Sequence, residues 1–328
     1  MLKKILPLLL LPLLLHARKA VVHPITQESK GPWFTGPLLT PSGHVIPFGH
    51  QNYEPYLYWF DLMGEYDNHW HFNSTPHFKT FESQTAWQFG IFPKAELDFI
   101  SQFVYNNCKG KHFWRVADQP IAMAFQLLMD EPGGWYPAIK VRVGAVIPLG
   151  KYDRLNPKQF ETDSAGLGNW APSLGLTSIR TFHFGRDHFL AWRMNVNYTF
   201  TVPIPVHGLS LYGGAPSSQG VKGTRGTVYP GNILVIQQGF EYSFTLNWAV
   251  ALDLMYQHNN RNRFSGHSPP GTKPVLPSAE LFSIAPAVEY NFNENIGMIF
   301  GPWVTVAGRN DSNTDQFLAW VFAINVYH

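Results

Sequence analysis

The feature that most constrains the fold of this chain is a strict alternation of apolar and polar residues over ten or more positions at a time. In the clearest run, Leu190, Trp192, Met194, Val196, Tyr198, Phe200 and Val202 share one face of an extended chain. The pattern returns near residues 138–144, 248–257, 282–292 and 318–326. Because successive side chains of a β-strand point to opposite faces, a period of two predicts strands with one apolar face.

The length of these runs separates two classes of all-β protein. Strands of a soluble β-sandwich commonly have about 5–6 residues, whereas a tilted strand needs about 9–11 residues to cross a bilayer. Charged residues make up only 14% of the chain and aromatic residues 15%, while a soluble domain has about 25% charged residues. Since backbone polar groups must all be paired in hydrocarbon, such a sheet has to close. We therefore predict an antiparallel up-and-down transmembrane β-barrel, with a soluble sandwich or barrel as the alternative.

The turns and links between the alternating runs predict about twelve strands. They begin near Tyr53, Thr85, Ala95, Gln119, Ala138, Pro172, Phe189, Asn232, Asn247, Ala279, Ile296 and Asp315. Short links alternate with longer ones near 66–81, 106–118, 151–168, 206–231, 258–278 and 309–314, as expected for short periplasmic turns and longer outer loops. An even number of strands places both ends of the chain in the periplasm. The first hairpin is the least defined, so ten and fourteen strands remain alternatives.

The first residues predict export. Lys3 and Lys4 precede an apolar run at 5–15 and a cleavage site at 15–17, which is the layout of a secretory signal peptide. The apolar run is shorter than the roughly 20 residues of a membrane anchor. We expect a cleavable signal peptide at 1–17, a Pro/Gly-rich extension at 18–52 and an outer-membrane barrel at 53–328. The extension lacks alternation, and either a plug inside the lumen or a periplasmic tail would account for it.

The partners expected from the sequence are those of an outer-membrane protein. The chain ends on an alternating strand, which predicts delivery to the barrel-assembly machinery, although Tyr327 is followed by His328 where an aromatic residue usually ends the chain. Outer-membrane lipid, lipopolysaccharide and a small-molecule permeant are further expected partners. A net charge of +2 argues against a nucleic-acid partner. Oligomeric state is not predicted. Cys108 is the single cysteine, which excludes an internal disulfide, and we expect an unreactive thiol in an outer loop.

Eight charged residues fall on predicted inward faces of strands. They are Glu96, Asp98, Lys140, Arg142, Arg193, Glu241, Asp253 and Glu289. Acids and bases on neighbouring strands predict a network across the lumen. One interpretation is a filler whose charges pair; the other is a constriction that selects permeants by charge and size.

Two further groups of residues are weaker candidates for chemistry. His69 and His71, with His77 nearby and His44 and His50 as further candidates, could bind Zn²⁺ through imidazole. They alternate with Trp70 and Phe72, so an ordinary aromatic loop is the competing interpretation, and we predict no metal or cofactor. A lipid hydrolase would need a serine nucleophile beside a histidine base. The segment 257–262, Ser265 and His267 do not form that pattern, and no enzyme is predicted.

A family resemblance accompanies these patterns. The segment at 143–153, with Pro148, Gly150 and Tyr152, and the Gly-rich stretch at 166–176 resemble the outer-membrane transporter barrels associated with the meta-pathway of phenol degradation. The segments 92–97 and 256–264 occupy matching places, and Leu149 stands where that family often has threonine. The resemblance covers about 53–328 and implies uptake of aromatic compounds.

The sequence thus favours an outer-membrane channel or transporter that passes small, hydrophobic or aromatic molecules. A non-transporting surface protein with partner-binding loops is the alternative, and a lipid hydrolase is a minor one.

Overall fold

The computed structural model describes residues 31–131, 134–185, 188–217 and 222–328. The predicted signal peptide at 1–17 and the first part of the extension, 18–30, lie outside these residues. The described part of the chain contains sixteen strands and the short 3-10 helix η2 (Pro157–Gln159). None of its helices is long and apolar enough to cross a membrane.

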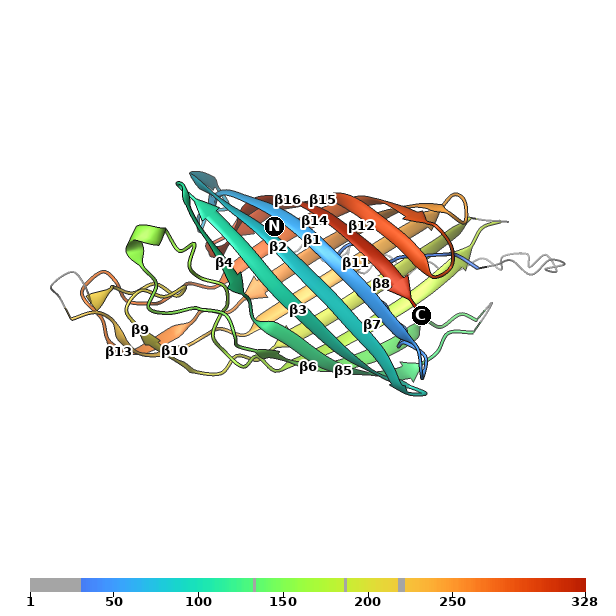
Figure 1. The fold of residues 1–328 in the computed structure, drawn as a ribbon, viewed down its shortest axis with the longest axis horizontal. Helices are drawn as coiled ribbons and strands as arrows, with labels where there is room; N and C mark the ends of the chain where they lie inside the picture. The colour runs from blue at the N-terminus through green and yellow to red at the C-terminus, as the bar shows by residue number, and fades with distance from the viewer. Residues whose placement is uncertain (1–30, 132–133, 186–187, 218–221) are drawn as a thin grey trace. The chain divides into compact units, whose positions relative to one another are not determined.

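Twelve of the strands form a closed antiparallel barrel (Figure 1). They are β1 (Gln51–Tyr66), β2 (Phe72–Phe92), β3 (Ala95–Cys108), β5 (Gln119–Leu128), β6 (Ala138–Ile147), β7 (Ser173–His183), β8 (Phe189–Thr199), β11 (Ile233–Ser243), β12 (Trp248–Asn259), β14 (Ala279–Asn291), β15 (Ile296–Arg309) and β16 (Asp311–Tyr327). Each pairs with its neighbours in chain order, and β1 pairs with β16 to close the ring. The predicted twelve-stranded barrel is confirmed.

Four strands lie outside this ring. β4 (Lys111–Val116) forms a tight hairpin with the outer end of β3. β9 (Ile204–His207), β10 (Arg225–Tyr229) and β13 (Arg263–His267) form a separate three-stranded sheet. Figure 1 shows this small sheet beyond one end of the barrel, with the C-terminus near the other end. The turns between β2 and β3 and between β14 and β15 lie at the end near the C-terminus, which is the periplasmic end in the predicted orientation.

Eleven of the twelve predicted strand starts lie within four residues of the observed ones, and the exception is Thr85. β2 begins at Phe72, so most of the link predicted at 66–81 belongs to strands. The links predicted at 106–118 and 309–314 are likewise mostly strand. At the outer ends of these hairpins both faces of a strand carry polar residues, such as Lys79 and Thr80 on β2, so the alternation that marks a strand disappears there.

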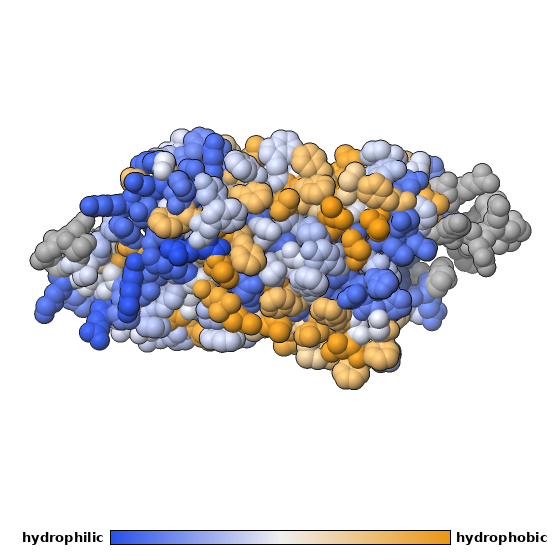
Figure 2. Space-filling model, viewed as in Figure 1, coloured by the Kyte–Doolittle hydropathy of each residue, from blue (hydrophilic) through white to orange (hydrophobic). Residues whose placement is uncertain are grey.

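The barrel wall has large apolar side chains outside and small ones inside. Ala124, Ala191, Ala249, Ala285 and Ala319 have no exposed surface. On the opposite face, Trp59, Leu174, Val288, Phe300 and Trp320 are among the exposed large apolar residues. Figure 2 shows apolar residues gathered over the middle of the visible face and hydrophilic residues toward the end with β9, β10 and β13. A soluble protein rarely exposes so continuous an apolar surface, and hydrocarbon is the solvent that it fits.

Candidate functional site

The described part of the extension, residues 32–50, runs along the inner wall of the barrel; we call it the N-terminal segment. Proline at positions 32, 37, 41 and 47 removes backbone donors and prevents regular structure. Five of its residues, at 36–38, 40 and 43, are buried, and buried backbone N–H and C=O groups need partners. Side chains from the barrel wall supply them.

Asp253 on β12 holds the middle of the N-terminal segment. Its Oδ2 accepts the Leu39 N–H at 3.1 Å, and its Oδ1 accepts the Thr40 N–H at 3.0 Å and the Thr40 hydroxyl at 2.6 Å. Gln237 on β11 adds a bond from its Nε2 to the Leu39 carbonyl at 3.0 Å. Asp253 and Thr40 are buried. One carboxylate therefore accepts three hydrogen bonds from two consecutive residues.

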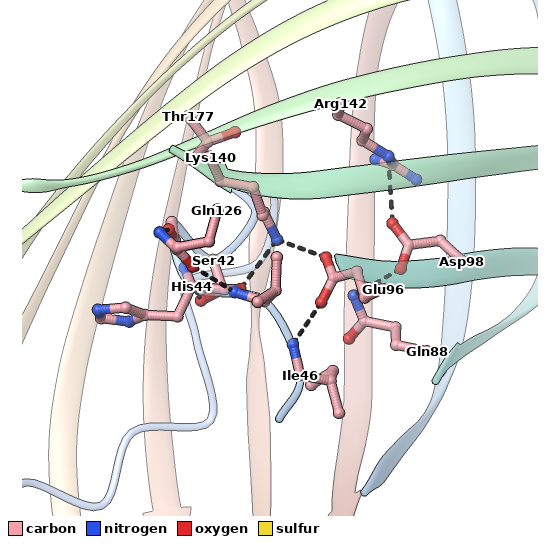
Figure 3. Close-up of polar contacts among 12 residues, drawn as sticks. Ser42, His44, Ile46, Gln88, Glu96, Asp98, Gln126, Lys140, Arg142 and Thr177 are labelled. Carbon is pink, nitrogen blue, oxygen red and sulfur yellow. Dashed lines mark hydrogen bonds and ion pairs between the residues drawn. The ribbon is translucent and has the colours of Figure 1, made fainter. Parts of the chain in front are cut away.

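A second anchor lies on β3 and β6 (Figure 3). Lys140 Nζ donates to Glu96 Oε1 at 2.7 Å and to the His44 carbonyl at 3.0 Å. The other oxygen of Glu96 accepts the Ile46 N–H at 2.6 Å. Glu96 has no exposed surface, and Lys140 is 3% exposed. The buried ion pair thus completes its hydrogen bonding with the backbone of the N-terminal segment, as a buried pair requires.

Gln126 on β5 continues this anchor. Its Nε2 donates to the Gly43 carbonyl at 3.0 Å, and its Oε1 accepts the Val45 N–H at 2.8 Å. Gln126 and Gln237 were not among the predicted site residues. Both occupy inward positions of their alternating strands, and uncharged amides at such positions were the signal that could have identified them.

A third anchor lies on β8, β11 and β14. Arg193 forms an ion pair with Glu241, with 2.7 Å between guanidinium nitrogen and carboxylate oxygen. Glu289 accepts the backbone N–H of Thr35, and the Thr35 hydroxyl donates to Asn291 Oδ1 at 3.0 Å. Gly36 lies against the Arg193 guanidinium, and a Cβ at this glycine would be 3.1 Å from its Nη1.

All eight predicted lumen charges are on the inner side of the wall. Six of them form three ion pairs: Glu96 with Lys140, Asp98 with Arg142 at 3.2 Å, and Glu241 with Arg193. The two that remain, Asp253 and Glu289, have no cationic partner within ion-pair distance in the described residues. These are two of the acids that accept backbone N–H groups of the N-terminal segment. The segment therefore supplies the donors that the wall lacks.

A cluster of aromatic residues, absent from the predicted site residues, also lines the inside of the barrel. Tyr56, Tyr58 and Phe60 alternate along β1, and adjacent ring centroids are 5.7 and 5.6 Å apart. Phe60 contacts Trp303 and Phe317 edge to face, with centroids 5.8 and 5.6 Å away. We call these five residues the lumen aromatic cluster. Their period of two beside Glu54 could have identified the β1 members.

At the outer end, Asp118 fastens a long loop to the wall. Its carboxylate oxygens accept the Gly150 N–H at 2.8 Å and the Leu167 N–H at 2.7 Å. Burial raises the pKa of the Asp118 carboxyl, and these backbone donors act against that shift. A cavity of about 160 Å³ opens at this end, with Tyr212, Gln257 and Leu276 among its lining residues.

The histidines of the weak metal candidate lie in and beside the outer β1–β2 hairpin. His69 and His71 are in its turn, where their backbone N–H groups donate to Asp67. His77 is on β2, and its Nδ1 is 2.7 Å from Asp61 Oδ1. Within the described ranges no group of three or more His, Cys, Asp or Glu residues could hold a metal ion.

Two other expectations concern single residues. Cys108 was expected in an outer loop, but it is the last residue of β3 and is 7% exposed, because β3 and β4 meet in a tight turn. Ser265 lies on β13 of the small sheet, opposite Thr227. His258 faces Asn260 at 3.1 Å and Glu280 at 3.7 Å. Neither arrangement joins a serine to a histidine base among the described residues.

Comparison with known proteins finds the same architecture. No protein-family model matches the chain, and no curated protein sequence matches it. The COG4313 outer membrane channel from Pseudomonas putida F1 superposes with a TM-score of 0.64 at 12% identity, covering 88% of this chain and 98% of that one. At this identity the likeness establishes the barrel fold.

Two further solved structures share less. The β-domain of the Bordetella autotransporter BrkA gives a TM-score of 0.44 at 11% identity, over 84% of this chain and 98% of that one. The TodX deltaS2S3 mutant monoaromatic hydrocarbon channel gives 0.37 at 13% identity, over 86% and 90%. The chain is thus a twelve-stranded barrel whose fold is similar to that of an outer membrane channel.

Proposed function

We propose that this protein is an outer-membrane channel for small hydrophobic or aromatic molecules, exported by its N-terminal signal peptide. The N-terminal segment is its gate. The observation that carries the proposal is that polar contacts to Asp253, Glu96 and Gln126 hold this segment. Water can replace the segment as the hydrogen-bond partner of each of these side chains when the segment leaves the wall. Leu38 of the segment adds apolar packing, because it belongs to the same buried cluster as Tyr58 and Phe317.

The lumen aromatic cluster supports the class of permeant. Aromatic rings attract other rings edge to face by about 0.5–1.5 kcal/mol beyond the area that they bury. Weak sites of this strength suit conduction, because a permeant must be able both to bind and to leave. The charged groups of the lumen select permeants by charge and size, and they bind the N-terminal segment when the gate is closed. Binding of an aromatic solute at Phe60 and Trp303 would precede its passage past the gate.

The test is ion current through the full mature chain in a planar bilayer, with benzyl alcohol and its saturated analogue cyclohexylmethanol as blockers of similar size. We expect discrete openings that benzyl alcohol interrupts more strongly. The variant Phe60→Ala should lose this preference. Phe300→Ala is the matched control, because Phe300 is 51% exposed on the outer face.

Equal block by the two solutes, or loss of the preference in Phe300→Ala, would contradict the aromatic class. Absence of ion current at all voltages and salt concentrations would contradict the channel function. It would favour the alternative of a surface protein that acts through its outer loops.

A further inference from the structure

The outer surface of β1, β2 and β3 changes from aromatic to polar at one register step. Trp59, Phe81 and Tyr105 are direct cross-strand partners in a row. One step toward the outer ends of the same strands, the outward residues are Asp61, Lys79 and Asn107, again direct partners. An apolar band that ends in aromatic residues and then in charge marks the interface of a membrane with water.

A cavity of about 330 Å³ lies across this boundary. Its lining consists of Trp59, His77, Lys79, Phe81, Tyr105, Asn107 and Lys109. The row of rings continues on β4, where Trp114 is opposite Tyr105 at a centroid distance of 5.1 Å. Figure 2 shows hydrophilic residues over the outer ends of these strands, next to apolar ones. The cavity therefore offers rings on its membrane side and cations on its water side.

The cations of this cavity differ from those of the lumen in their partners. Lys140, Arg142 and Arg193 each have a carboxylate within ion-pair distance. Lys79 and Lys109 have none within 4.0 Å among the residues that the structure describes.

The nearby groups leave these two lysines available. Asp61 is opposite Lys79, but its carboxylate is bonded to His77 at 2.7 Å. Lys109 Nζ lies 4.8 Å from the centroid of the Phe160 ring, a contact that leaves room for an anion.

We propose that this cavity binds the phosphorylated glucosamine headgroup of lipid A, the membrane anchor of lipopolysaccharide. Lys79 and Lys109 bind a phosphate, and Trp59, Phe81 and Tyr105 contact the first carbons of the acyl chains. A phosphate carries up to two negative charges and accepts charge-assisted hydrogen bonds from lysine. The position at the outer boundary fits a lipid whose phosphates lie above hydrocarbon. The proposal rests on the outer-membrane location of the barrel and is independent of transport.

The test is native mass spectrometry of the full mature chain in detergent, titrated with purified lipid A and with the same lipid after removal of its phosphates. We expect wild-type protein to retain one lipid A preferentially, with an affinity for the dephosphorylated form at least tenfold lower. The double variant Lys79→Gln/Lys109→Gln should lose roughly thirtyfold in affinity for lipid A, because each lysine near an anionic surface contributes about a fivefold gain in affinity. Both residues are exposed, so the barrel should fold normally.

The matched control is Lys94→Gln/Lys273→Gln, which removes the same charge from two exposed lysines outside the cavity. It should bind lipid A as wild type does. Equal binding of the two lipids would overturn the proposal, as would an equal loss in the control variant or no retained lipid in wild type. Competition by inorganic phosphate at the same concentration as lipid A would also overturn it, because it would assign the site to free phosphate.

Discussion

Removing the Asp253 carboxylate should release the middle of the N-terminal segment while leaving the barrel intact. Each hydrogen bond to a charged acceptor contributes about 1.5–3 kcal/mol. The two bonds from Thr40 share one oxygen, so we count them as one contact and the Leu39 bond as another. The expected loss in Asp253→Ala is therefore about 3–6 kcal/mol, and since 1.4 kcal/mol is a factor of ten, local opening should rise about 10²–10⁴-fold.

Hydrogen exchange measured by mass spectrometry on the detergent-solubilised chain reports this opening directly. The backbone amides of Leu39 and Thr40 should lose protection by that factor, and the amides of β12 should not. Asp98→Ala is the matched control, because Asp98 is a buried lumen acid that contacts Arg142 and Gln88 but not the segment. Unchanged protection of Leu39 and Thr40 in Asp253→Ala, or an equal loss in Asp98→Ala, would refute the anchoring role.

Three other perturbations test the neighbouring contacts. Lys140→Ala leaves Glu96 buried without a cation and should lower the free energy of unfolding, measured in denaturant, by about 3–5 kcal/mol. The double variant Lys140→Met/Glu96→Leu removes both charges and should lose much less stability. An equal loss in the two variants would contradict the pairing of Lys140 with Glu96. Gly90→Ala places a Cβ 2.0 Å from the Pro47 carbonyl oxygen and should cost about 1–3 kcal/mol. The Gly49 amide, which donates to the Gly90 carbonyl at 3.0 Å, should then exchange faster. Asp118→Ala removes the acceptor of two loop amides, and limited proteolysis should then cut within 149–168 while wild type is protected; equal resistance would exclude the anchor.

Most of the barrel could be predicted from the sequence because its solvent changes across the wall. Hydrocarbon outside and polar contacts inside impose a period of two on the sequence. This period predicted the first residues of β8, β12 and β14 to within one position. The same reasoning placed all eight lumen charges inward. It failed for the first part of β2, where water lies outside the strand and the contrast between the two faces vanishes.

The contacts of the N-terminal segment could not be predicted from any local pattern. They join residues from 50 to more than 200 positions apart, such as Ile46 with Glu96 and Thr40 with Asp253, and many of the donors are backbone groups that every residue except proline possesses. The sequence indicated a Pro/Gly-rich extension with two possible locations. Only the arrangement of unpaired acids on β12 and β14 shows why the lumen is a favourable one.

The pairing of the first strand, β1, with the last residue of the chain has a consequence for the order of folding. Gln51 and His328 exchange backbone hydrogen bonds, each at 2.8 Å, so β1 completes its pairing only when the last residue is in place. The N-terminal segment ends at this seam, next to Gln51, and contacts Glu96 on one side of the barrel and Glu289 on the other. Its anchors therefore come together only once the ring has closed, and the entropy of closing such long loops opposes earlier docking. We therefore expect the segment to dock last during assembly, so that protection of the Thr40 amide from exchange reports a closed barrel.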